Sequence, residues 1–345
     1  MKAAVIREHG GPEVVKIEQI PDPHAGVGEV VINVRAAALN HLDIWTIKGG
    51  RGPGLAGPHV IGSDCSGVVA QVGQGVVNVK LGAPVIMAPG LSCGRCEWCQ
   101  RGQQSECATF GIIGLSRDGT YAQKVVVPAA NLQPKPAHLS FEEAAALSLA
   151  HVTAWRMVFT RAALRPGEDV LIHGIGGGVS LAALQLARMV NARVIVTSSS
   201  DEKLSRALAM GAEHGINYKT APDIALAVRD YTAGRGVDVA IDTVGAATFP
   251  IDVKAVRKGG RIVLCGVTTG AMAQADLRAI YWNQLTIMGS TGGSHEDYRR
   301  LVRAVEASKL RPVVDTVMPL DKAREALERL ASANQFGKIV LLIAD

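Results

Sequence analysis

The sequence predicts an α/β protein with two domains, a small β-barrel and a doubly wound parallel sheet. Short β-branched strands and glycine turns fill residues 1–88, as in a small barrel. Helical and strand patterns then alternate from Val170 to Gly289, as in a parallel sheet with helices on both faces. The tail returns to mixed structure, and we expect it to rejoin the barrel. The predicted domains are therefore 1–150 with 292–345, and 151–291.

Composition limits the classes of function. The chain has 345 residues, of which 48% are hydrophobic and 19% charged, as in a compact soluble protein. Its formal net charge of +5 comes from scattered Lys and Arg without a basic run, which argues against a dedicated nucleic-acid surface. No signal-peptide pattern and no apolar span of about eighteen residues is present. We expect a cytoplasmic protein without membrane or nucleic-acid partners.

A strand–turn–helix–strand unit lies at the centre of the chain. Val170–His173 is apolar enough for a buried strand, Val179–Met189 repeats apolar residues at helical spacing, and Arg193–Thr197 closes the unit as a second strand. Four glycines turn the chain after the first strand: Gly174, Gly176, Gly177 and Gly178. Glycines let a backbone approach a pyrophosphate, and a helix N-terminus offers it unpaired N–H groups. We predict a dinucleotide site here rather than an ordinary tight turn, although Ser180 stands where many such motifs have their last glycine.

Four of the six cysteines cluster in a lobe at about residues 90–110. Cys93, Cys96, Cys99 and Cys107 have the spacing C-x2-C-x2-C-x7-C. Four thiolates can saturate a tetrahedral zinc, whereas the common iron–sulfur spacings differ and disulfides would be unusual in a cytosolic chain. The spacing predicts one structural Zn²⁺ with no position open to substrate.

With barrel, cysteine lobe and nucleotide unit in this order, the sequence resembles a medium-chain dehydrogenase/reductase over nearly its whole length. The resemblance implies a GroES-like catalytic domain and a Rossmann domain for NAD or NADP. The superfamily contains zinc-dependent alcohol dehydrogenases and zinc-free quinone or enoyl reductases. The lobe favours the first group, and the other motifs favour the second.

The places where the alcohol dehydrogenases hold their catalytic zinc are altered. Asn40 and Ser63 replace a cysteine and a histidine, and the third ligand position falls near Leu149. These side chains cannot make a normal catalytic zinc site. Asn40 instead resembles the asparagine that lies near the nicotinamide in the quinone reductase branch. An alternative metal set would use His41, Asp43, His59, Asp64 and His151; we favour packing and backbone hydrogen bonding for these residues.

The cofactor prediction depends on the end of the second nucleotide strand. No carboxylate follows Thr197 until Asp201, so nothing repels a 2′-phosphate, and Ser198 and Lys203 could donate hydrogen bonds to it. We therefore expect NADPH to be preferred over NADH. The predicted cofactor-contacting residues are Asn40, Thr153, Gly174, Gly176, Gly177, Gly178, Val179, Ser198, Ser199, Lys203, Tyr218, Gly266, Ser290 and Lys338.

Several of these assignments come from the resemblance alone. It implies that Thr153 lies beside the nicotinamide, that Tyr218 flanks the adenosine and that Lys338 reaches the pyrophosphate. The alternatives are a plain helix residue for Thr153, a solvated surface lysine for Lys338, and ordinary turns at Gly266 and Ser290.

The leading hypothesis is an NADPH-dependent reductase of an activated C=C bond or a quinone, acting on a small molecule without catalytic zinc. A backbone N–H or Asn40 would polarise the carbonyl, and the candidate catalytic residues are Asn40, His41, Asp43 and Asp64. One alternative is an alcohol dehydrogenase with atypical zinc ligands, and another is a non-catalytic, crystallin-like NADPH-binding protein. The apolar edge strand Leu285–Gly289 predicts a homodimer or homotetramer.

Overall fold

The computed structural model describes residues 1–49, 55 and 57–343. The chain divides into two units, 1–152 with 292–345, and 153–291. The first division falls within helix α3 (Phe141–Trp155), two residues beyond the predicted boundary at 150, and the second coincides with the predicted boundary at 291. No helix in the described part of the chain is both long and apolar enough to cross a membrane.

Unit 1 is built on a mixed sheet in the order β10-β6-β5-β3-β18-β17, with β9 also paired to β3; its pairs are antiparallel except for β17 and β18, which run parallel. Strand β3 is central because its length lets β5 and β9 pair along it while β18 pairs with its end. The strands of this sheet are β3 (Glu29–Ala38), β5 (Asp64–Val72), β6 (Pro84–Met87), β9 (Lys124–Pro128), β10 (Leu132–Pro134), β17 (Val314–Pro319) and β18 (Lys338–Leu342).

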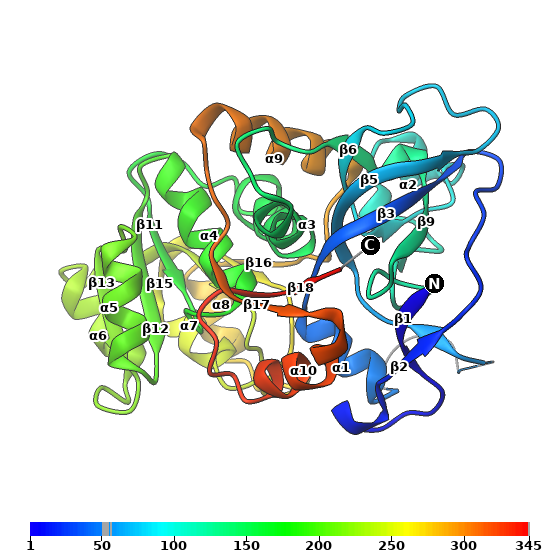
Figure 1. The fold of residues 1–345 in the computed structure, drawn as a ribbon. Helices are drawn as coiled ribbons and strands as arrows, with labels where there is room; N and C mark the ends of the chain where they lie inside the picture. The colour runs from blue at the N-terminus through cyan, green and yellow to red at the C-terminus, as the bar shows by residue number, and fades with distance from the viewer. Residues whose placement is uncertain (50–54, 56, 344–345) are drawn as a thin grey trace. The chain divides into compact units, whose positions relative to one another are not determined.

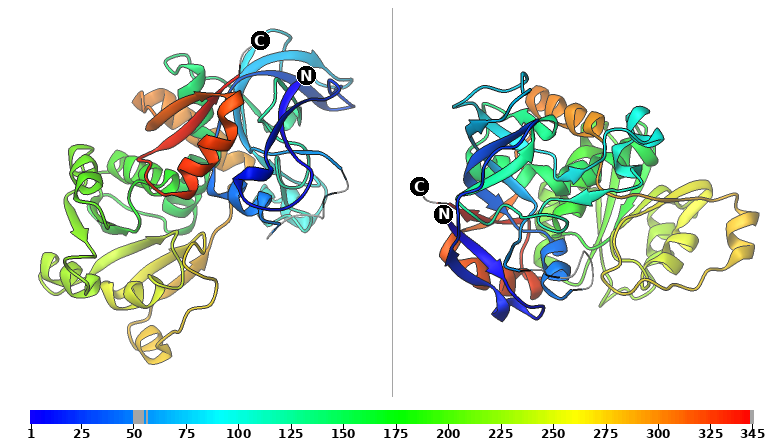
Figure 2. Two further views of the ribbon diagram at one scale, coloured as in Figure 1. Left: turned by 60° about the horizontal axis from the view of Figure 1, so that its bottom comes forward. Right: turned by 90° about the vertical axis from the view of Figure 1, so that its right-hand side faces the viewer.

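The C-terminal tail completes this sheet, as the sequence predicts. Strand β18 lies antiparallel to the end of β3, where Val340 is opposite Ala38, and Figure 2 shows the red end of the chain beside the blue strands. The apolar faces of both segments share one core with buried residues of helix α10 (Ala323–Ala331), including Leu327. Outside this sheet and the cysteine lobe, the unit contains β1 (Lys2–Ile6), β2 (Lys16–Gln19), β4 (His59–Val60), α1 (His41–Ile47), α9 (His295–Ser308) and α10 (Ala323–Ala331).

The cysteine lobe is a short excursion from this unit. Strands β7 (Gly90–Leu91) and β8 (Gly111–Ile112) pair at its base, and α2 (Glu97–Gln100) lies between them. Because the lobe is small and has little regular structure, an interaction other than an apolar core has to stabilise its conformation.

Unit 2 is an all-parallel sheet of six strands in the order β13-β12-β11-β14-β15-β16 (Figure 1). The strand order reverses direction after β13, so right-handed crossovers put helices on both faces. The strands are β11 (Asp169–Ile172), β12 (Arg193–Ser198), β13 (His214–Asn217), β14 (Val237–Asp242), β15 (Val256–Leu264) and β16 (Thr286–Gly289). The helices are α4 (Gly178–Met189), α5 (Asp201–Ala209), α6 (Ile224–Tyr231), α7 (Phe249–Ala255) and α8 (Leu277–Trp282).

From the sequence alone, a capping box at Ser140–Glu143 predicts a helix through Leu149, and a second helix is expected at His151–Ala163. The structure shows that this division into two helices is wrong. Helix α3 runs through this point to Trp155 and continues as a π-helix over Arg156–Arg161. No glycine or proline interrupts the segment, and its alanines are buried, so tertiary packing extends the helix.

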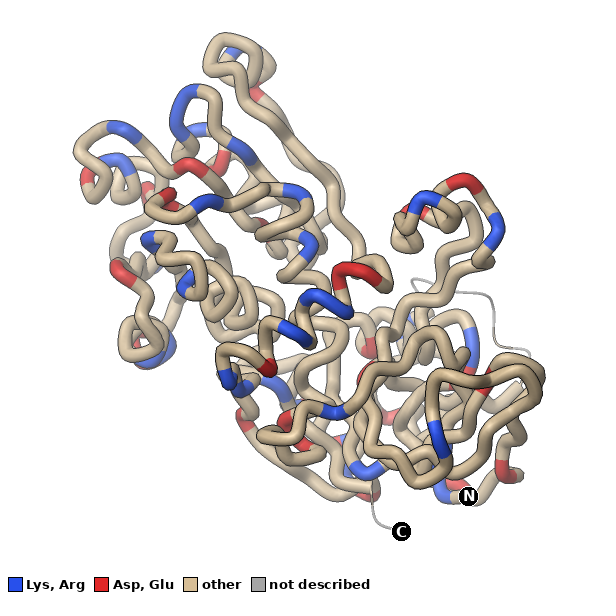
Figure 3. The backbone as a smooth tube through the Cα atoms, turned by 90° about the horizontal axis from the view of Figure 1, so that it is seen from above, with Lys and Arg blue, Asp and Glu red and all other residues tan. Residues whose placement is uncertain are grey.

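Charges of both signs are spread over both units. Figure 3 shows Lys and Arg positions interspersed with Asp and Glu positions along the backbone. This distribution agrees with the absence of a basic run in the sequence.

Candidate functional site

The polar centre of unit 1 forms where three neighbouring strands meet. Asp64 opens β5 and is opposite Ala38 of β3, while β18 runs antiparallel to the same end of β3. Carrying the β18 register two residues further puts Lys338 opposite Asn40, and the Leu39 N–H bond to the Ile339 carbonyl at 2.9 Å agrees with it. Residues 40, 64 and 338 thus meet through sheet pairing.

Lys338 is buried in an ion pair at this centre. Its Nζ lies 3.1 Å from Asp64 Oδ2 and 2.5 Å from Asn40 Oδ1. The side chains of Lys338 and Asp64 are 4% and 0% exposed, so the interpretation of Lys338 as a solvated surface lysine is wrong. Its contact with the cofactor pyrophosphate stays a prediction, and would require it to leave these partners.

The partners of Asn40 determine which way its amide faces. Lys338 can only donate and the Asp64 carboxylate only accepts, so Oδ1 faces the ammonium and Nδ2 the carboxylate. Nδ2 donates to Asp64 Oδ2 at 2.9 Å and to the Ala38 carbonyl at 3.3 Å. Both amide hydrogens therefore have acceptors inside unit 1. Donation from the Asn40 amide to a substrate carbonyl stays a prediction, and would require one of these hydrogen bonds to be given up.

The second carboxylate oxygen of Asp64 fixes backbone. Oδ1 accepts the Leu149 N–H at 2.7 Å, and the Asp64 carbonyl accepts the Thr120 hydroxyl at 2.9 Å. Because both carboxylate oxygens are engaged, Asp64 acts as a structural acceptor in this arrangement. Ser63, beside it in the chain, is 1% exposed, and its hydroxyl has no hydrogen-bond partner among the residues that the structure describes.

Asp43 is enclosed next to this centre. Its Oδ2 accepts the Asn40 N–H at 2.8 Å at the start of α1, and the Tyr121 hydroxyl at 2.5 Å. Burial raises the pKa of Asp43 to about 6, opposed by the Tyr121 hydrogen bond. Tyr121 is fully buried and carries no motif, so sequence reasoning missed it.

The three histidines considered as metal ligands do not form one group with each other in the described residues. His41 is exposed and lies edge-on to Trp45, and partial desolvation lowers its pKa. His59 contacts the Gly114 carbonyl at 3.0 Å and Asp118 at 3.3 Å. His151 is buried in α3. Within residues 1–49, 55 and 57–343, the only group of three or more His, Cys, Asp or Glu able to share a metal is the four cysteines.

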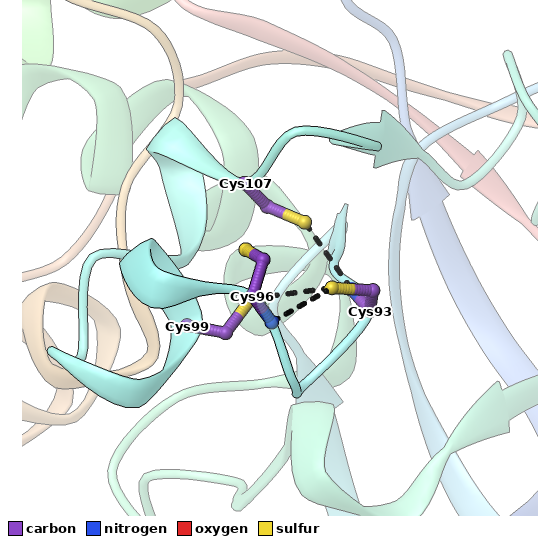
Figure 4. A group of neighbouring side chains, drawn as sticks. All are labelled: Cys93, Cys96, Cys99 and Cys107. Atoms are coloured by element: carbon purple, nitrogen blue, oxygen red, sulfur yellow. Dashed lines mark hydrogen bonds between the residues drawn. The ribbon is translucent and has the colours of Figure 1, made fainter.

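The four cysteine sulfurs converge in the lobe (Figure 4). All lie within 4.8 Å of one another, and Cys93 Sγ and Cys99 Sγ are 4.0 Å apart. A tetrahedral zinc with Zn–S bonds of about 2.3 Å requires sulfurs about 3.8 Å apart, so the cluster fits this metal. Cys93 Sγ and Cys107 Sγ each accept a backbone N–H at 3.3 Å, and the Cys93 N–H lowers the pKa of Cys107 to about 6. The surroundings of Cys107 thus favour the thiolate, which zinc binds, whereas burial raises the pKa of Cys99 to about 11.

Unit 2 brings the predicted cofactor residues to one edge, because the carboxyl ends of parallel strands lie together. Gly174 and Gly176 adopt φ of 65° and 115° after β11, conformations that favour glycine. Gly177, Gly178 and Val179 begin helix α4, a position suited to an anion. Ser198 is the last residue of β12, and three further predicted contact residues follow the ends of β13, β15 and β16 by one or two positions: Tyr218, Gly266 and Ser290.

The end of β12 is organised by its own hydroxyls. Ser198 Oγ accepts the Ser200 N–H at 3.2 Å, and Ser200 Oγ caps α5 through the Lys203 N–H at 3.3 Å. The Tyr218 N–H donates to the Ser198 carbonyl at 3.1 Å, which holds the backbone of Tyr218 beside Ser198, and the Tyr218 side chain is exposed. Thr153 lies on α3 and is 5% exposed.

The chain matches two family models. The alcohol dehydrogenase GroES-like domain covers residues 26–137, and the zinc-binding dehydrogenase domain covers residues 178–307. A zinc-type alcohol dehydrogenase-like protein of Schizosaccharomyces pombe is 37% identical over 338 residues, which cover 96% of this chain and 94% of that protein. An acryloyl-coenzyme A reductase of Metallosphaera sedula is 30% identical over 342 residues, or 99% of each chain.

A solved structure extends the comparison. The crystal structure of an NAD-dependent alcohol dehydrogenase matches with a TM-score of 0.96 and 46% identity, over 100% of both chains. Fold, site and matches together define an oxidoreductase that uses a nicotinamide cofactor. The chain belongs to the medium-chain dehydrogenase/reductase superfamily, in its zinc-type alcohol dehydrogenase-like branch.

The buried Asp43 carboxyl predicts a specific pH dependence of stability. Its pKa is about 6 in the folded protein and 3.8 in an ordinary environment, so the folded state holds its proton more tightly. The resulting stabilisation is complete below about pH 4 and is lost as the pH rises through 6, amounting to about 3 kcal/mol. Asp43→Asn keeps an oxygen for Asn40 and Tyr121 but cannot titrate.

Urea unfolding of both proteins between pH 4 and 7.5 measures this effect. The variant should gain stability relative to the unmodified protein as the pH rises. Parallel curves for the two proteins would contradict the assignment of this titration to Asp43.

Proposed function

We propose that this oxidoreductase reduces an activated C=C bond or a quinone with NADPH and needs no catalytic metal. The observation that carries the proposal is the polar centre of unit 1. Asn40 and Ser63 stand where zinc ligands would be expected, and both oxygens of Asp64 are engaged by protein donors. The relative that is named an acryloyl-coenzyme A reductase supports the choice of a conjugated double bond.

The cofactor supplies a hydride, and this chain supplies binding and polarisation. The turn at Gly174–Gly178 and the start of α4 would hold the pyrophosphate, with Ser198, Ser199 and Lys203 at the 2′-phosphate. Because the Asn40 hydrogens are engaged, we assign carbonyl polarisation to a backbone N–H. His41 is our candidate proton donor, because its ring is exposed whereas Asp43 and Asp64 are enclosed.

We also propose that Cys93, Cys96, Cys99 and Cys107 bind one structural zinc. The fit of the sulfur positions supports it, and so does the small amount of regular structure in the lobe. Four sulfur ligands leave no position for substrate, so the metal would stabilise the lobe without joining the chemistry.

An alcohol dehydrogenase with atypical zinc ligands is the second candidate. The 46% identity to a crystallised NAD-dependent alcohol dehydrogenase favours it. A non-catalytic, crystallin-like NADPH-binding protein is the third, and it predicts binding without turnover of any enone, quinone or alcohol.

Substrate comparison separates these candidates. NADPH oxidation with enones and quinones should exceed, by at least tenfold in kcat/KM, the reduction of NADP⁺ by simple alcohols, because no Lewis acid stabilises an alkoxide. The rates should not change when a chelator removes weakly bound metal. Alcohol oxidation that dominates and depends on added zinc would favour the second candidate instead.

The cofactor preference has its own test in Ser198→Asp. A carboxylate at this strand end would repel the 2′-phosphate and accept a hydrogen bond from a ribose hydroxyl. The ratio of kcat/KM for NADPH to that for NADH should fall by at least tenfold, whereas Ser198→Ala, the uncharged control, should change it less. Equal use of both cofactors by the unmodified protein would contradict the proposed preference.

We further propose that the protein assembles at least as a dimer through the β16 edge of the unit 2 sheet. This edge strand exposes Ile287, and the preceding helix α8 exposes Leu277, Tyr281 and Trp282, which are 65–72% accessible. Ile287→Lys should shift sedimentation at micromolar concentration toward the monomer. An unmodified protein that already sediments as a monomer would refute the assembly.

A further inference from the structure

A fully buried hydrogen-bonded chain lies beneath the glycine turn of unit 2. Asp252 of α7 lies 2.8 Å from His173 Nε2, and His173 Nδ1 lies 3.1 Å from Thr197 Oγ1. Thr197 Oγ1 in turn accepts the N–H of Gly174 at 3.3 Å. The three side chains come from α7, from the residue after β11 and from β12, and each is at most 1% exposed.

One arrangement of the protons satisfies every link of this chain, and we assign it here. The Asp252 carboxylate accepts from Nε2–H, which leaves Nδ1 to accept the Thr197 hydroxyl proton. The hydroxyl then has a lone pair free for the Gly174 N–H. Every link of the chain is a donor meeting an acceptor, so Asp252 orients the imidazole, the imidazole orients the hydroxyl, and the hydroxyl holds the first glycine of the turn.

Thr197 connects two segments that the cofactor would contact. Its carbonyl accepts the Ile175 N–H at 2.9 Å, so Thr197 holds two consecutive turn residues, and the next residue in the chain is Ser198. His173 contributes a further link, because its carbonyl accepts the Ser180 hydroxyl at 2.7 Å. Ser180, which stands in place of the usual glycine, therefore ties the first turn of α4 to the end of β11.

We propose that Asp252, His173 and Thr197 are positioning residues for the dinucleotide: they hold the glycine turn and the end of β12 in the relative position that cofactor binding requires. The assignment rests on the proposed role of this turn in binding the pyrophosphate. A phosphate group bound by backbone N–H groups demands fixed positions for them, so loosening the turn should weaken cofactor binding and leave the chemistry intact.

Thr197→Val and Thr197→Ser form a matched pair. Valine keeps the β-branched shape and removes the hydroxyl, whereas serine keeps the hydroxyl and removes a methyl group. Titration of each purified protein with NADPH, followed by cofactor fluorescence, should give a Kd at least tenfold higher for the valine variant and within about threefold for the serine variant. The KM for NADPH should rise in parallel, while kcat at saturating cofactor and the KM for an enone stay within about twofold.

Asp252→Asn is the second variant, and it allows the proposal to be tested even if the Thr197→Val protein does not fold. The amide oxygen can still accept from Nε2–H but without charge, so the Kd for NADPH should rise by about two- to fivefold. Melting temperatures measured without cofactor report the purely structural effect of each change.

The outcomes separate this assignment from the proposed function. An unmodified protein that does not bind NADPH or NADH would overturn both. Normal cofactor binding by Thr197→Val, or equal losses in the valine and serine variants, would overturn the positioning role alone. A fall in kcat without a rise in Kd would also contradict it.

Discussion

The buried ion pair between Lys338 and Asp64 is the interaction on which the rest of unit 1 depends. It joins the first residue of the last strand to the first residue of β5, and Asn40 bonds to both. Two charges without solvent are stable only when each is paired and hydrogen-bonded, and removing one partner of such a pair costs about 3–5 kcal/mol. The pairing of the C-terminal strand β18 with β3 is therefore needed to form this site as well as the core of unit 1.

This ion pair also determines what the site can do. The ammonium of Lys338 lies beside the amide of Asn40 and the carboxylate of Asp64. A metal can bind an alkoxide directly, which alcohol oxidation needs. Reduction of a conjugated double bond does not need a metal ion, because hydrogen-bond donors can stabilise the charge that develops on the carbonyl oxygen. This difference is the reason for proposing reduction of a conjugated double bond over oxidation of an alcohol.

Local patterns in the sequence predicted the elements but not the long-range pairs. The strand–turn–helix–strand unit and the sixth strand of the sheet follow from periodicity and glycine positions, and the structure has both. The cysteine cluster follows from spacing alone. The burial of Lys338 could not be predicted, because it depends on the register between residues almost 300 positions apart.

Two further features were beyond sequence reasoning for the same reason. Tyr121 reaches Asp43 across 78 positions, and His173 reaches Asp252 across 79, and neither pair has a local signature. The break predicted near Leu149 failed for a different reason, because the burial of α3 overrides a weak local pattern.

Metal content per chain tests the central claim, that one zinc is structural and hydride transfer needs no second metal, most directly. The purified protein is analysed for zinc by mass spectrometry before and after dialysis against a chelator, with activity on an enone measured at each step. The account predicts one zinc per chain, retained through dialysis, and activity that does not vary. Two zincs per chain, with activity lost when the weaker one is removed and regained when it is restored, would contradict it.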